Sequence, residues 1–198
     1  MSRYTRRAPK WTYRRRFFFI TEGEETEKSY LDIAYDKLDL REHCTFCFRH
    51  DKSSIESMLT EAKKVECSTK FKPKQGDEIW IILDQDAESH LPIQVKQLSM
   101  WEKEKEYRHV VISSPRFEYW LLLHFEQKPS RRNSLSNTYV EERIPNFKKI
   151  PRTSRTINLE NMMQATERAL KGQYPTCETP NILGSGMGLL LSRLFALR

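Results

Sequence analysis

The sequence predicts an α/β fold in which a mostly parallel, four-stranded sheet carries helices on both faces. Two observations lead to this prediction. Short apolar runs of strand length alternate three times with longer segments of helical periodicity. In addition, the run EIWIIL at residues 78–83 is continuously apolar and β-branched, which is typical of a strand buried on both faces.

The elements follow from local patterns. Strands are predicted where apolar, aromatic or β-branched residues cluster, at residues 16–21, 45–49, 78–83 and 109–113. Helices are predicted where apolar residues recur at i, i+3 and i+4, at residues 24–38, 53–66, 92–105, 114–125, 159–171 and 188–197. Ser53 and Glu56 match a capping box, and Ser114-Pro115 matches a helix start. Residues 127–157 show little periodicity, which favours a functional or flexible loop.

These elements divide the 198 residues into one compact domain with appended segments. The predicted parts are a basic tail at 1–16, an α/β core at 17–126, a basic loop or insertion at 127–157, and C-terminal helices at 158–198 that pack on the core. No stretch of about 18 apolar residues predicts a membrane span, and the basic N-terminus lacks the apolar middle of a secretory signal. The four cysteines lack a disulfide spacing, so we expect a reducing, cytoplasmic location.

The positive charge is concentrated in two segments. The chain has a net charge of +7, and seven basic residues lie in its first 16 positions, which leaves 27 basic and 27 acidic residues elsewhere. Between residues 127 and 156, eight basic residues accompany only two acidic ones. This pattern predicts contact with nucleic acid, although a solubilising tail and a solvated loop would also account for it. The candidate contact residues are Arg14, Arg15, Arg16, Arg131, Arg132, Lys148 and Lys149.

Acidic residues follow two of the predicted strands. Glu22 comes directly after the first strand, and Asp84 and Asp86 come directly after the third. Because sites of parallel α/β sheets collect at the carboxyl ends of the strands, these carboxylates converge if the two strands are neighbours. Oxygen-only ligands suit Mg²⁺ or Mn²⁺ better than zinc. Gly23 beside Glu22 permits an abrupt turn.

Several acids near these strand ends also fit ordinary structural roles. Glu24, Glu25 and Glu27 are expected to support a helix start, with Thr21 and Glu24 forming a capping box. Asp84 and Asp86 could be ordinary loop acids. An Asp-x-Asp pair also occurs in HAD-type phosphatases, but those carry it near the chain start and have threonine or valine where Ala87 stands here.

Histidines and cysteines offer weaker candidates. His43, Cys44, Cys47 and His50 invite a zinc site, but on a strand the two cysteines would face opposite sides. A structural role is favoured over a catalytic one for the histidines near the acidic blocks, His90 and His124. The segment at 184–186, Gly-Ser-Gly, is interpreted as a helix-entry turn, because it lacks the lysine of a phosphate-binding P-loop.

Three blocks of the sequence resemble a known family. The stretches ITEGEETEKSYLD, WIILDQDAE and ISSPRFEYWLLLHF are similar to signature blocks of the RloB-like family, and TPNILGSGMGLLLSRL is similar to its final helix. A strand ending in Glu-Gly and a later strand ending in Asp-x-Asp also resemble the Toprim fold. The resemblance implies a Toprim-like domain in which Glu22 is the catalytic glutamate and Asp84 and Asp86 bind metal. Glu118 would add a further acid or only shape the site.

The same resemblance implies a function. It predicts a magnesium-dependent nuclease that cleaves RNA or DNA in bacterial antiphage defence, often encoded beside an AAA or SMC-like ATPase. The alternative is a non-catalytic subunit that binds nucleic acid or acts as the effector of such an ATPase complex. Assembly as a homo-oligomer stays open.

Overall fold

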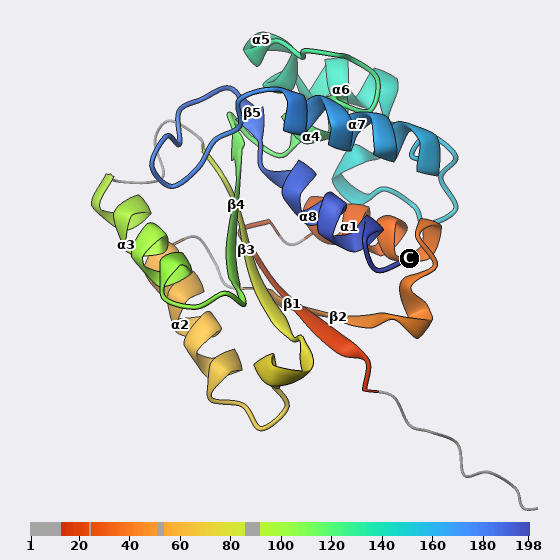
Figure 1. Cartoon of the computed structure of the whole chain (residues 1–198). Helices are drawn as coiled ribbons and strands as arrows, with labels where there is room; N and C mark the ends of the chain where they lie inside the picture. Colours follow the sequence, from red (N-terminus) through yellow and green to blue (C-terminus); the bar gives the residue numbers. More distant parts are fainter. Residues whose placement is uncertain (1–12, 24, 51–53, 86–91) are drawn as a thin grey trace, which may run out of the picture.

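The protein contains a five-stranded sheet with the strand order β2-β1-β3-β4-β5 (Figure 1). The computed structural model describes residues 13–23, 25–50, 54–85 and 92–198. The strands are β1 Arg15–Thr21, β2 Cys44–His50, β3 Glu78–Asp84, β4 Arg108–Ser114 and β5 Gly184–Ser185. The first four pair in parallel, and β5 pairs antiparallel with β4.

The predicted mostly parallel sheet is therefore confirmed, but the predicted count of four strands is wrong. The fifth strand, β5, contains only two residues, and it joins the sheet where Ser185 pairs with Ser113. A two-residue strand is too short to show the alternation by which strands are recognised. The helix-entry turn predicted for the same residues is compatible with this strand, which leads directly into α8 at Met187–Phe195.

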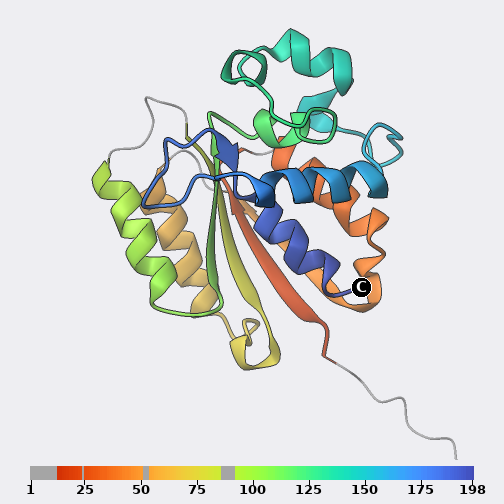
Figure 2. The same ribbon diagram turned by 45° about the horizontal axis from the view of Figure 1, so that its top comes forward.

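Helices cover both faces of the sheet, as Figure 2 shows. The helices are α1 Thr26–Lys37, α2 Ile55–Glu66, α3 Pro92–Lys103, α4 Glu118–Leu122, α5 Arg131–Ser134, α6 Asn137–Arg143, α7 Leu159–Lys171 and α8, with 3₁₀ turns η1 Leu40–Glu42, η2 Pro73–Gln75 and η3 Phe147–Lys149. One core lies under α2 and α3, and a larger core lies under α1, α4, α7 and α8. The chain therefore forms three layers, with the sheet in the middle.

The side chains of β1 show how the strands serve both cores. Phe17 and Phe19 pack under α1, whereas Phe18 and Ile20 pack against the opposite core. This is the two-residue period of a strand, here with both faces buried. It explains why the run RFFFIT is apolar without interruption.

Two predicted helix starts need correction. The helix expected at Ser114-Pro115 begins only at Glu118, because Ser114 is the last residue of β4. At α2 the cap is Ser54, whose hydroxyl accepts a hydrogen bond from the Ser57 amide at 3.2 Å. Ser53, the predicted cap, lies outside the described residues.

The segment at 127–157, expected as a loop, contains α5, α6 and η3. Its apolar residues are buried in the larger core: Val140, Ile144, Phe147 and Ile150 are each at most 2% exposed. Helices of four and seven residues are too short to show a helical period in the sequence. Within the described part of the chain, no helix combines the length and the apolar character needed to cross a membrane.

Candidate active site at the carboxyl edge of the sheet

Glu22 and Asp84 meet at the carboxyl ends of the neighbouring strands β1 and β3. Thr21 pairs with Ile82 in the parallel register, and the Glu22 amide donates to the Ile82 carbonyl at 3.2 Å. The Asp84 amide in turn donates to Glu22 Oε2 at 3.2 Å. The strand order thus brings together two of the predicted acids. Asp86, the third, lies outside the described residues.

The strand period decides which helices meet Asp84. Trp80 and Ile82 pack into the core under α1 and α4, so Asp84, two residues further on, belongs to the same face. Helix α1 contributes Glu27 to this face, and α4 contributes Glu118. Burial raises the pKa of Asp84 well above its ordinary range, and repulsion from Glu27, Glu118 and Glu22 raises it further, against a hydrogen bond with the Phe117 backbone.

Glu27 is a member of the site that sequence reasoning missed. The sequence predicts only a supporting role for it at the start of α1, yet its side chain is 5% exposed and lies against Gly23. A Cβ atom on Gly23 would stand 2.3 Å from Glu27 Oε2, so a larger residue at position 23 would make the Glu27 carboxylate shift from this position. Burial raises the pKa of Glu27 to about 7, with repulsion from Glu118 and Glu22 adding to it and a backbone hydrogen bond opposing it.

Helix α1 begins at Thr26, and the Thr21 hydroxyl donates to the Gly23 carbonyl at 2.7 Å. Glu24 lies outside the described residues, so the predicted capping box of Thr21 and Glu24 stays a prediction. The turn between β1 and α1 therefore folds the first helical turn back over the strand end and buries Glu27 there.

The chemistry of the donors at this edge fits a hard divalent cation. Asp84 Oδ1 and Glu27 Oε2 are buried without a hydrogen-bond partner in the part of the chain that the structure describes. Buried carboxylate oxygens without partners are costly, and a cation offsets both their desolvation and their mutual repulsion. Across the described ranges, however, no three Asp, Glu, His or Cys side chains form a complete ligand set. The described residues can supply only part of such a site.

Arg116 is a second site residue that sequence reasoning missed. Its Nε lies 3.3 Å from Glu118 Oε2 and donates to the Ser134 carbonyl at 3.1 Å, while Nη2 donates to Asn137 Oδ1 at 2.9 Å. It therefore places a guanidinium group at the acidic edge and attaches α5 and α6 to it. Arg116 stands in the sequence beside the candidate acid, in Pro-Arg-Phe-Glu at 115–118. The sequence pattern, however, predicts it in the first turn of a helix starting at Pro115, with no role at the site.

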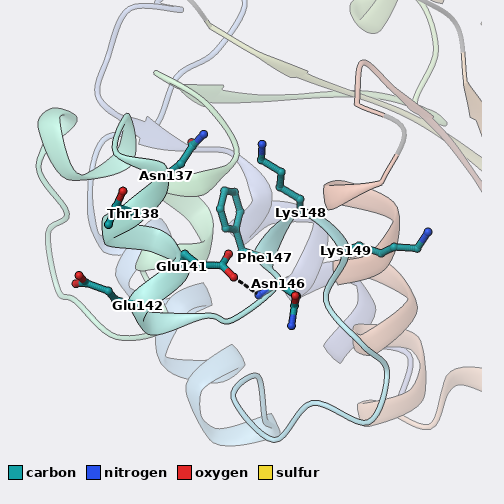
Figure 3. Close-up of a pocket in the computed structure, with 8 residues that line it drawn as sticks. All are labelled: Asn137, Thr138, Glu141, Glu142, Asn146, Phe147, Lys148 and Lys149. Carbon is teal, nitrogen blue, oxygen red and sulfur yellow. Dashed lines mark hydrogen bonds between the residues drawn. The ribbon is translucent and has the colours of Figure 1, made fainter.

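Two of the predicted basic residues lie close to this edge. Lys149 forms an ion pair with Glu25, Nζ to Oε1 at 2.9 Å, and the Thr26 hydroxyl donates to the Lys148 carbonyl at 3.3 Å. Figure 3 shows the groove beside them, of about 630 Å³, in which Lys149 extends over α1 and Lys148 extends toward the side of Asn137. These contacts hold η3 against the first turn of α1, next to the acids.

The other basic candidates divide between the two ends of the sheet. Arg131 and Arg132 are exposed on α5, in the segment that Arg116 attaches to α4. Arg14, Arg15 and Arg16 precede or begin β1, at the end of the sheet opposite to Glu22 (Figure 1). Seven residues of strand separate the two ends by roughly 20 Å. The described part of the tail is therefore remote from the acids.

His124 is buried, and Cys44 and Cys47 pack in or against the two cores, whereas His43 is exposed. His124 is 2% exposed, its Nε2 lies 3.2 Å from the Tyr30 hydroxyl, and burial lowers its pKa to about 4. Cys44 and Cys47 pack on opposite faces of the sheet, as the strand period predicted. His90 lies outside the described residues.

Comparison with known proteins identifies one relationship. The family model described as RloB-like protein matches residues 17–194. No curated protein and no solved structure gives a significant match. The matched range includes both strand ends that carry the acids, α4 with Glu118, and α8 except for its last residue.

Proposed function

The chain belongs to the RloB-like protein family, and on that basis we propose that it is a metal-dependent phosphodiesterase that cleaves nucleic acid in bacterial antiphage defence. One observation carries the proposal: at the acidic edge where Glu22, Glu27, Asp84 and Glu118 meet, Glu27 Oε2 and Asp84 Oδ1 are buried without a hydrogen-bond partner among the described residues. The parallel order β2-β1-β3-β4, with acids after the adjacent β1 and β3, supports a Toprim-like fold.

The proposed roles follow from position. Asp84 and Glu22 would hold Mg²⁺ or Mn²⁺, with Asp86 as a third candidate ligand. When bound, the ion supplies Lewis-acid stabilisation of the negative charge on phosphate. The Asp84 amide orients the Glu22 carboxylate through its 3.2 Å hydrogen bond. Glu27, held against Gly23, can take up a proton at Oε2, and the Arg116 guanidinium can hold phosphate oxygens.

Nucleic acid would approach over the segment at 127–157. Lys148, Arg131 and Arg132 belong to this segment, and no ion pair of theirs is found among the described residues. Backbone phosphates are the partners expected for such side chains, because contact releases counterions. Arg14, Arg15 and Arg16 would contact only a substrate long enough to reach the other end of the sheet.

The test is a cleavage assay with purified protein. Transfer RNA, single-stranded DNA and duplex DNA are incubated with Mg²⁺, with Mn²⁺, or with a chelator. We expect cleavage only with metal, and we expect Glu22→Gln and Asp84→Asn to reduce it by at least about 100-fold with little loss of folding.

A matched control is available three residues from Glu22. Glu25 is an exposed acid whose carboxylate pairs with Lys149, so Glu25→Gln makes the same chemical change outside the buried edge. It should cleave within about twofold of wild type. Undiminished cleavage by the Glu22 or Asp84 variant would refute the assignment.

A second function is favoured by a separate observation, the exposed apolar side chains of α7 and α8. Met163 is 56% exposed, and Leu170 and Leu189 are each 40% exposed. Such a surface is suited to a partner protein, in keeping with an effector subunit of an AAA or SMC-like ATPase complex. Co-purification with a candidate AAA or SMC-like ATPase, followed by the cleavage assay with and without it, distinguishes an autonomous nuclease from a dependent one.

A further inference from the structure

A large cleft adjoins the acidic edge on its β5 side. Its volume is about 1220 Å³, and it lies between α4 with the residues that follow it, the C-terminal half of α7, and residues 182–185. Pockets for drug-sized ligands have volumes of roughly 300–1,000 Å³, so this cleft is larger than a typical small-molecule site. Nothing in the proposed roles of the acids uses it.

The cleft is close to the proposed catalytic acids. Asp84 pairs with Ser113, and Ser113 pairs with Ser185, which lines the cleft. Adjacent strands are about 4.8 Å apart, so the backbone of Ser185 lies roughly 10 Å from that of Asp84. Helix α4 contributes to both places, since Glu118 belongs to the acidic edge and Tyr119 lines the cleft.

One loop connects the two places directly. Gln85 Nε2 donates to Asn181 Oδ1 at 3.2 Å, and the Ser113 and Ser185 hydroxyls lie 2.8 Å apart. The segment from Asn181 to Ser185 is therefore attached to the strand ends at both of its limits. A ligand in the cleft contacts a wall that is fixed to the catalytic edge.

The charged groups of the cleft favour an anion. Three cations, Lys128, Arg168 and Lys171, line it together with a single acid, Glu167. Glu167 forms an ion pair with Lys171 at 2.5 Å, and no ion pair of Lys128 is found in the described part of the chain. The lining therefore has two more positive than negative side chains.

Arg168 is held in a defined position. Its Nη1 donates to the Leu123 carbonyl at 2.7 Å, and its Nη2 lies 3.3 Å from Gln164 Oε1. The first contact joins α7 to the end of α4, and the second lies within α7. Together they use only part of the five donors of a guanidinium group. A phosphate oxygen in the cleft can accept from the remaining donors.

The rest of the lining suits nucleobases. The side chains of Gln127, Gln164 and Gln173 offer amide donors and acceptors, and Leu123 and Leu183 add apolar surface. A ligand that combines a repeated anion with flat, partly apolar groups and polar edges is a nucleotide chain. Such edges are accessible only where the bases are unpaired.

We infer that this cleft binds single-stranded nucleic acid immediately beside the phosphate that is cut, with Lys128, Lys171 and Arg168 contacting its backbone. The inference rests on the proposed function, since it places the cleft next to the reacting phosphate. It extends that function by assigning the substrate class: a single-stranded region of RNA or DNA rather than a continuous duplex.

Binding without cleavage tests the inference. Fluorescence anisotropy of a short labelled single strand, of RNA or of DNA, is measured with the full chain in a chelator over a series of salt concentrations. We expect Lys128→Glu and Lys171→Gln to weaken binding roughly five- to tenfold, and Lys128→Glu to lower the salt slope by about 1. Binding to a duplex of the same sequence should be weaker than to the single strand.

Lys105→Glu is the matched control. Lys105 is exposed in the turn before β4, at the opposite end of the sheet, and its substitution changes the net charge as Lys128→Glu does. We expect less than about a twofold effect from it. Thermal melting verifies that each variant is folded.

Each result of the binding experiment either supports or overturns the inference. Equal binding by the Lys128 and Lys105 variants would overturn the cleft assignment, as would equal or tighter binding of duplex, or no binding of any strand by the wild type. A mononucleotide that competes as well as the strand would assign the cleft to a free nucleotide and overturn the placement of a chain there. If the cleft variants weaken binding but no metal-dependent cleavage is found, the nuclease proposal alone is refuted. If the protein cleaves but Lys128→Glu binds as well as wild type, the cleft proposal alone is refuted.

Discussion

Substituting Glu27 by glutamine should remove a pH dependence of stability that the buried acidic edge imposes on the fold. The pKa of Glu27 is about 7 in the folded protein, against an ordinary value of 4.5. The unfolded chain therefore releases this proton near pH 4.5, and the folded chain holds it until about pH 7. Between these values the folded state binds more protons, so the free energy of unfolding falls as the pH rises.

The magnitude follows from the difference between the two pKa values. At 1.36 kcal/mol for each pH unit, the step from 4.5 to about 7 corresponds to about 3 kcal/mol. This stability is present below pH 4.5 and lost once the pH passes about 7. The raised pKa of Asp84 acts in the same direction. The free energy of unfolding of the wild-type protein should therefore fall by at least this amount as the pH rises.

The assay is urea unfolding in a chelating buffer from about pH 5 to about pH 8, followed by tryptophan fluorescence, since Trp80, Trp101 and Trp120 are each at most 5% exposed. Over this range the free energy of unfolding of Glu27→Gln should fall by about 2.5 kcal/mol less than that of the wild type. The control Glu25→Gln changes an exposed acid of the same turn and should keep the wild-type slope.

The slope, rather than the absolute stability, is the decisive quantity. A glutamine at position 27 can lose or gain a hydrogen bond at every pH. Such a change shifts the free energy of unfolding by the same amount at each pH and leaves its pH dependence unaltered. A Glu27→Gln variant with the wild-type slope would refute the conclusion that this carboxyl group is buried among like charges.

Three further predictions concern the same residues and their supports. Mg²⁺ at neutral pH should raise the melting temperature of the wild type by several degrees but not that of Asp84→Asn, and an equal shift in both would contradict a metal site at Asp84. Gly23→Ala should displace the Glu27 carboxylate, 2.3 Å from the new Cβ, and lower cleavage at least about tenfold, whereas in a Glu27→Ala background it should have little further effect. Asp77→Ala removes the buried acceptor of the Tyr13 hydroxyl, which lies at 2.7 Å. It should lower the free energy of unfolding, measured by urea titration, by about 2–4 kcal/mol. A loss below about 1 kcal/mol would contradict the hydrogen bonding described.

Most of the elements could be predicted because their patterns are local. The run at 78–83 became β3, and the helix predicted at 159–171 was found as α7 with the same limits. The pairing of Glu22 with Asp84 was also predictable, on the condition that β1 and β3 are neighbours, and they are. Sequence reasoning failed for β5 and α5, which are too short to produce a period.

The identities of Glu27 and Arg116 as site residues could not be predicted, for a different reason. Both lie within predicted helices, at 24–38 and 114–125, where local patterns indicate an ordinary role or none. Glu27 is buried because the turn at Gly23 folds α1 back over the end of β1, and Arg116 reaches the edge because α4 starts late. In each case the course of the backbone is set by tertiary packing, and a local sequence pattern does not indicate it.

The sequence by itself determined the alternation of strands and helices, the acids at two strand ends, and the family. Only the tertiary structure decided that the face of β3 bearing Asp84 is the one covered by α1 and α4, so that Glu27 and Glu118 share the edge with Glu22 and Asp84. It also placed Arg14, Arg15 and Arg16 at the far end of the sheet and Lys149 beside Glu25. The physical reason is that strand and helix periods are properties of neighbouring residues, whereas burial and repulsion between carboxylates arise from contacts across the fold.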